Sequence, residues 1–190
     1  MKLKKILQEV QFPFLKNYIA THPEAQKGTA THEDVFELYA NELHKAIWNK
    51  YHTMSFAKGT AGKFNSGWDV DMDFHSGNII LSHDAISDED PMPVVVGSKL
   101  RGKSVDWISI DYISVTPHWQ GHRGIDGSAD VVGYDDEKNE VAFDDISVDV
   151  YPKWTGDIKK DLKLWEDGAR NIIKNIMNKL PKHDASASRD

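Results

Sequence analysis

The sequence contains no cysteine. This absence excludes a disulfide framework, thiolate metal ligands and a cysteine nucleophile. The sequence also lacks a GxSxG nucleophile element, an HExxH zinc pattern and the glycine fingerprint that follows a strand in dinucleotide-binding folds. The segment from Gly59 to Phe64 fails as a phosphate loop, because Phe64 stands where Ser or Thr would bind Mg²⁺. No pattern here identifies an enzyme, and we predict no cofactor.

No apolar run approaches the roughly 18 residues of a membrane-spanning helix. Near the start, Gln8, Glu9 and Gln11 interrupt the apolar residues that a signal peptide would need. We therefore expect a soluble protein without a membrane segment, with a cytoplasmic location as the default. A length of 190 residues and a hydrophobic content of 39% favour one domain over residues 1–183, followed by a disordered tail over 184–190.

Negative charge is concentrated in the middle of the sequence. Residues 65–151 contain 18 acidic and five basic residues, a net charge of −13, whereas the two flanks together carry +6 of the overall −7. Such asymmetry bears on partners and association rather than on fold. It argues against direct binding to nucleic acid and favours a basic partner.

Apolar residues at helical spacing predict helices towards both ends of the sequence. The first covers residues 2–11, because Pro13 stops or kinks it, and a dense apolar cluster at 12–19 is compatible with a second short helix. A longer helix is predicted over residues 32–56. The helical period returns from Asp157 and ends at Pro181.

Alternation with a period of two predicts strands between these helices. In residues 68–75 the apolar side chains alternate with Asp69, Asp71, Asp73 and His75. The other expected strands are rich in β-branched and aromatic residues and cover 79–81, 93–96, 105–115, 129–134 and 140–151, with a basic loop at 97–104.

The order of helix, about six strands and helix indicates an α+β domain. We predict a mostly antiparallel sheet over residues 68–151, packed on one face by the N-terminal helical segment and the long C-terminal helix. An antiparallel sheet needs only one covered face. The other face is therefore expected to present aspartates to solvent or to a partner.

These aspartates are the first candidate site. If Asp69, Asp71 and Asp73 lie on a strand beside Asp145 and Asp149, several carboxylates share one surface. Such a surface can occupy a nucleic-acid-binding protein by imitating the charge of nucleic acid, or it can bind Mg²⁺ or Ca²⁺. The third alternative is a solvated face that resists aggregation. Directly opposed like charges destabilise a sheet, and this cost keeps the binding alternatives open.

The segment 116–127, predicted to be a loop, is the second candidate site. His118, His122 and Asp126 are its candidate metal ligands, and a His–Asp pair is suited to acid–base work. Trp119 and Arg123 are its candidate binding residues. The alternative is an ordinary polar loop. The basic cluster at 99–103 is compatible with contact to phosphate or an acidic partner, with pairing to the protein's own aspartates, or with a solubilising hairpin loop.

The resulting hypothesis is a non-catalytic binding or assembly protein that uses the acidic sheet face and the aromatic and basic loop. Its expected partner is a protein with a basic or nucleic-acid-binding surface, and an oligomer is compatible with this hypothesis. A phage-encoded inhibitor or virion component is one analogy for a small, acidic, cysteine-free protein. Two alternatives stay open: a metal-dependent hydrolase with Asp and His ligands, and a small-ligand carrier with an apolar pocket between sheet and helices.

Overall fold

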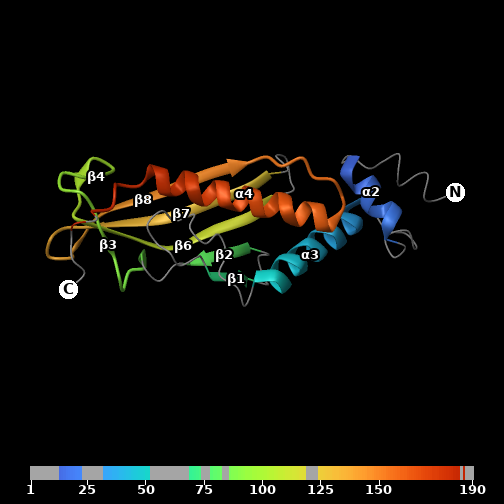
Figure 1. The fold of residues 1–190 in the computed structure, drawn as a ribbon, viewed down its shortest axis with the longest axis horizontal. Helices are drawn as coiled ribbons and strands as arrows, with labels where there is room; N and C mark the ends of the chain where they lie inside the picture. The colour runs from blue at the N-terminus through green and yellow to red at the C-terminus, as the bar shows by residue number, and fades with distance from the viewer. Residues whose placement is uncertain are drawn as a thin grey trace.

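A computed structural model of the chain describes residues 13–22, 32–51, 69–73, 78–82, 86–118, 124–184 and 186. Figure 1 shows their arrangement, with one long helix lying across a sheet and two shorter helices towards one end. The elements in chain order are α2 (Pro13–Thr21), α3 (His32–Tyr51), β1 (Asp69–Asp73), β2 (Asn78–Ser82), β3 (Met92–Pro93), β4 (Lys99–Leu100), β5 (Lys103–Ser104), β6 (Trp107–His118), β7 (Gly124–Tyr134), β8 (Glu140–Val150) and α4 (Ile158–Lys179).

The main sheet is six-stranded and antiparallel. Its strand order is β1-β2-β6-β7-β8, and β3 pairs with one end of β6. The longest pairings are β6 with β7 and β7 with β8, which form two consecutive hairpins. A bulge interrupts β6 between Ile110 and Ile113. Strands β1 and β8 are consequently the two edges of the sheet.

Helix α4 covers one face of the sheet along β6, β7 and β8, and α3 contacts both α4 and β1 (Figure 1). The apolar stripe of α4 supplies Trp165, Ile172, Ile173 and Ile176, which are fully buried. The helix-facing residues of the sheet include Ile125, Ala129 and Val131 on β7 and Ile146 on β8. The predicted α+β fold, with helices on one face of an antiparallel sheet, is confirmed.

Most predicted elements are found with shifted ends. The predicted helix over 32–56 is α3, described to Tyr51, and the apolar cluster after Pro13 is α2. The predicted pairing of residues 68–75 with 79–81 is the β1–β2 hairpin. The predicted helix at 2–11 lies outside the described residues. At the C-terminal end, the backbone N–H of Asp184 donates to the carbonyl of Pro93.

The predicted strand over 93–96 is wrong in extent. Only Met92 and Pro93 pair with β6, and Val94 forms a single bridge to His183. Val95 and Val96 lie in an exposed turn, and the side chain of Val96 is 88% exposed. Apolar β-branched composition favoured a strand here. Val95 N–H donates to the carbonyl of Lys182 in the C-terminal segment, and the chain then turns.

The predicted basic loop at 97–104 contains a small hairpin instead. Leu100 pairs with Lys103 across a two-residue turn at Arg101 and Gly102. Both turn residues have positive φ, 51° and 83°, the combination that tight β-hairpin turns of type I′ require. The hairpin is anchored by Leu100, whose side chain is buried.

The predicted loop over 116–127 is largely strand. Strand β6 continues to His118 and β7 begins at Gly124, with Thr116 paired to Asp126. Residues 119–123 lie outside the described part of the chain. Two glycines of the predicted loop, Gly124 and Gly127, mark close approaches within the fold. A Cβ placed on Gly127 would lie 2.2 Å from Cγ2 of Ile172 on α4.

Gly127→Ala is expected to destabilise the protein by about 1–3 kcal/mol, because the new methyl group meets a β-branched side chain in the packed core. Urea unfolding followed by circular dichroism measures this change. In an Ile172→Ala background the added cost of Gly127→Ala should be much smaller, since the clashing methyl group is gone. An equal cost in both backgrounds would contradict the packing described here.

Candidate functional site

The face of the sheet opposite α4 is the first candidate surface. On β8 its residues are Phe143, Asp145, Ser147 and Asp149, all exposed. On β7 the register places Asp126, Ser128, Asp130 and Val132 beside them. We call these eight residues the open face. They alternate with helix-facing residues such as Ala129 and Ile146, which are buried.

Two pairs of aspartates lie directly opposite each other on the open face. Asp126 pairs with Asp149 and Asp130 with Asp145, and the pair Ser128–Ser147 lies between them. Side chains at paired positions of an antiparallel sheet are about 5 Å apart, so each pair sets like charges against each other. Like charges at directly opposed positions destabilise a sheet, and a cation bound between them relieves such repulsion.

The five aspartates of the predicted acidic surface lie on opposite edges of the sheet. Asp69, Asp71 and Asp73 are on β1, and Asp145 and Asp149 are on β8, with β2, β6 and β7 between them. Four strand spacings separate the two groups, about 19 Å. The condition that these residues lie on neighbouring strands is thus not met. Period-two alternation predicts a face, but it does not predict strand order.

The actual neighbours of Asp145 and Asp149 come from β7. Asp126 is a predicted metal ligand in the predicted loop at 116–127, and Asp130 has no predicted role. The signal that could have found them is their spacing, since Asp126, Ser128 and Asp130 alternate with Ile125, Gly127 and Ala129. Two adjacent hairpin strands with the same acidic alternation would be expected to pair their charges.

Of the candidate metal ligands, His118 and Asp126 lie on the paired strands β6 and β7, and His122 lies outside the described residues. His118 is the last residue of β6 and pairs with Gly124, whereas Asp126 lies on β7 opposite Thr116 and Asp149. Trp119, His122 and Arg123 lie outside the described residues. Within the described ranges, no group of three or more histidine, aspartate or glutamate side chains is arranged to hold a metal ion.

The aromatic residue that adjoins the open face is Tyr151, which sequence reasoning missed. Its hydroxyl donates to Oδ2 of Asp149 at 3.4 Å, and its side chain is 57% exposed. Partial desolvation and then the negative charge of Asp149 raise the pKa of Tyr151. Together with Phe143, it adds exposed aromatic area to the acidic surface.

Two basic side chains contact the outer edge of β8. Lys179 on α4 donates from Nζ to the carbonyl of Ser147 at 2.9 Å, and Arg101 Nε lies 2.6 Å from Oδ1 of Asp144. Charged residues at an edge strand oppose pairing with another strand. The outer edge of β8 is therefore poorly suited to pairing with another strand.

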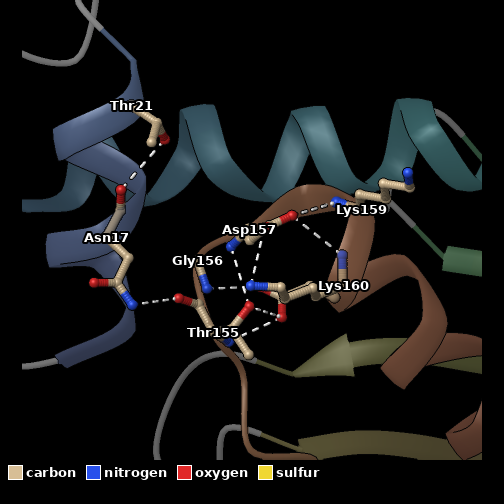
Figure 2. Close-up of polar contacts among 8 residues, drawn as sticks. Asn17, Thr21, Thr155, Gly156, Asp157, Lys159 and Lys160 are labelled. Atoms are coloured by element: carbon tan, nitrogen blue, oxygen red, sulfur yellow. Dashed lines mark hydrogen bonds and ion pairs between the residues drawn. The ribbon is translucent and has the colours of Figure 1, made fainter.

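The second candidate is a cleft of about 570 Å³ where α2 and α3 meet the start of α4. Its walls include Asn17 and His22 near α2, Glu42 on α3, and residues 155–160. Figure 2 shows the polar contacts in this region, where the side chain of Asn17 reaches the carbonyl of Thr155 at 2.8 Å. The cleft lies between the end of α2, the middle of α3 and the start of α4.

The polar groups of the cleft are occupied by one another. Asp157 is the N-cap of α4 and accepts from the backbone N–H groups of Lys159 and Lys160 (Figure 2). Glu42 accepts from the Tyr18 hydroxyl at 2.8 Å and lies 3.2 Å from Nε2 of His22. The cleft is therefore a joint between helices, in which these polar groups hydrogen-bond to one another.

A buried carboxylate holds this joint together. Asp161 is fully buried in the first turn of α4. Its Oδ1 accepts from the backbone N–H and the hydroxyl of Thr155, both at 2.8 Å. Its Oδ2 accepts from the backbone N–H of Gly156 at 2.8 Å and from the Tyr39 hydroxyl at 2.7 Å. Four donors from the loop and from α3 thus compensate the burial of one charge.

Comparisons with protein-family models, with curated proteins and with solved structures find no match. None of the helices in the described part of the chain has an apolar stretch long enough to cross a membrane.

Asp161→Asn is expected to destabilise the protein by about 2–4 kcal/mol. The amide nitrogen replaces an acceptor that receives two hydrogen bonds, so buried donors are left unpaired. Asp167→Asn, on the exposed side of the same helix, is the matched control and should stay within about 0.5 kcal/mol of the unaltered protein. Urea unfolding that gives equal values for both variants would refute the role of Asp161.

Tyr39→Phe is expected to remove part of the protein's alkaline sensitivity. Burial, with the charge of Asp161, raises the pKa of Tyr39 above its usual value. Above pH about 10 the unfolded chain loses the Tyr39 proton while the folded chain keeps it, so stability falls as pH rises, by at most about 1.4 kcal/mol per pH unit from this group. Unfolding free energies between pH 8 and 11 should therefore fall more steeply for the unaltered protein. Parallel curves would contradict this assignment.

Proposed function

We propose that this chain is a non-catalytic binding or assembly protein whose open face docks a protein partner that carries basic residues. The observation that carries the proposal is the pairing of Asp126 with Asp149 and of Asp130 with Asp145 on the side of the sheet opposite α4. Each pair lowers the stability of the free protein, by up to about 1 kcal/mol. A lysine or arginine placed over a pair turns this repulsion into attraction.

The spacing of these charges favours a basic protein surface over imitation of nucleic acid. The two aspartate pairs are four residues apart along β8, about 13 Å. A nucleic-acid duplex carries one charge for roughly every 1.7 Å of its axis. The open face is much less dense than this, and it also exposes Phe143, which has no counterpart in a phosphate backbone. An interface with a few cations around an apolar contact fits the face better.

The binding test uses a fluorescein-labelled octalysine peptide and fluorescence anisotropy at low salt. Asp145→Asn with Asp149→Asn should weaken binding by about fivefold to tenfold, because two exposed charge contacts are each worth up to about 1 kcal/mol. Asp136→Asn with Asp167→Asn removes the same charge at exposed positions outside the open face and should have a smaller effect. Raising the salt concentration should weaken binding to the unaltered protein.

The stability of the first variant controls for misfolding. Removing two charges from the opposed pairs should leave its unfolding free energy unchanged or raised, so lost binding cannot be attributed to unfolding. Equal weakening by both double variants would show that the peptide responds to net charge alone. That result would reject the open face as the docking surface.

A further inference from the structure

One end of the molecule combines exposed apolar and basic side chains. Val95 and Val96 are 45% and 88% exposed in the turn before β4, and Lys99 and Lys103 are exposed on the β4–β5 hairpin. We call these four residues the hairpin end. Figure 1 places β4 at the end of the molecule remote from α2. Exposed apolar residues beside cations are typical of a contact surface.

The hairpin end and the open face belong to opposite sides of the sheet. The anchor residue Leu100 lies close to Gly133, where an added Cβ would meet its Cδ2 at 3.2 Å, and Gly133 is on the helix-facing side with Ala142. Arg101 of the hairpin pairs with Asp144, whose register partner Val131 is also helix-facing. One molecule therefore cannot dock its own hairpin end on its own open face.

The two surfaces are complementary in charge and in apolar content. The open face has Asp126, Asp130, Asp145 and Asp149, with the exposed Phe143 next to the Asp130–Asp145 pair, whereas the hairpin end has two exposed lysines and two exposed valines. Helix α4 also exposes lysines, but the exposed large apolar side chains of the described residues include none from α4. The hairpin end is thus the described cationic surface that also matches Phe143.

We propose that the partner docked on the open face is the hairpin end of a second copy of this chain. This inference rests on the proposed function and specifies its partner. The contact joins two different patches, so it is heterologous, and repetition of it produces a ring if the rotation closes and an open chain of subunits if it does not. The charge contacts steer the copies together and set their orientation, while the valines and Phe143 lose water on contact.

Charge reversal tests the contact by sedimentation velocity of the full chain at low salt. The unaltered protein should sediment faster as its concentration rises, and high salt should reverse this. Lys99→Glu with Lys103→Glu places acid against acid, and Asp145→Lys with Asp149→Lys leaves the open face with two lysines opposite Asp126 and Asp130, without net charge to attract the hairpin end. Each variant alone should remain monomeric. An equimolar mixture should associate again, because the unaltered hairpin end of the second variant then meets the unaltered acidic open face of the first.

The outcomes separate this inference from the proposed function. An unaltered protein that stays monomeric at high concentration but binds octalysine through the open face would overturn self-association and leave the proposed function standing. If the unaltered protein neither self-associates nor binds octalysine through the open face, the self-association and the proposed function are both rejected. Self-association that survives Lys99→Glu with Lys103→Glu would reject the hairpin end as the docked surface. If Asp145→Lys with Asp149→Lys fails to fold, Asp145→Asn with Asp149→Asn should still weaken association.

Discussion

The hydrogen bonds of Asp161 are the constraint on which the rest of the structure depends. This carboxylate is fully buried and accepts from the Thr155–Gly156 loop and from Tyr39. A buried charge with any donor missing would cost several kcal/mol, so the loop, α3 and the first turn of α4 must keep one geometry. Gly156 fits it because its φ is 79° and a Cβ there would lie 2.0 Å from the carbonyl oxygen of Phe14. The direction of α4 across the sheet is set at this point.

Fixing α4 in this way divides the sheet into two different surfaces. The helix covers β6, β7 and β8 on one side, where Gly127 allows Ile172 to approach the backbone closely. The other side carries the acidic residues of the β7–β8 hairpin, and Lys179 and Arg101 contact the outer edge of β8. Burial of apolar area on one side compensates the repulsion placed on the other. The proposed docking surface is consequently a product of the same packing that stabilises the fold.

The sequence predicts the fold class because its two periodicities are strong. Alternation in residues 68–75 and 140–151 and the helical stripe from Asp157 to Pro181 identify the elements and their buried sides. The order of strands depends on long-range pairing, which alternation does not encode, so the sequence does not decide whether Asp69 and Asp145 lie on neighbouring strands. Gly124 and Gly127 were interpreted as loop residues, although they lie in β7 where other groups come close.

The position of Asp161 in the sequence indicates that it is buried, although it is not among the predicted site residues. It stands three residues after Ile158 and four before Trp165, on the apolar stripe of α4, where an acid is unexpected without buried partners. The identity of its partners could not be predicted, since Tyr39 is 122 residues away and Thr155 lies in an irregular loop. Side-chain networks of this kind are determined by the tertiary structure and not by local pattern.

The central claim, that the open face is the binding surface, is tested most directly by carboxyl-group footprinting. The protein is labelled with a carbodiimide and an amine, with and without octalysine, and labelled residues are identified by mass spectrometry. Labelling of Asp130, Asp145 and Asp149 should fall when the peptide is bound, and labelling of Asp136 and Asp167 should not change. Protection of Asp136 and Asp167 with unchanged labelling of the open face would contradict the claim.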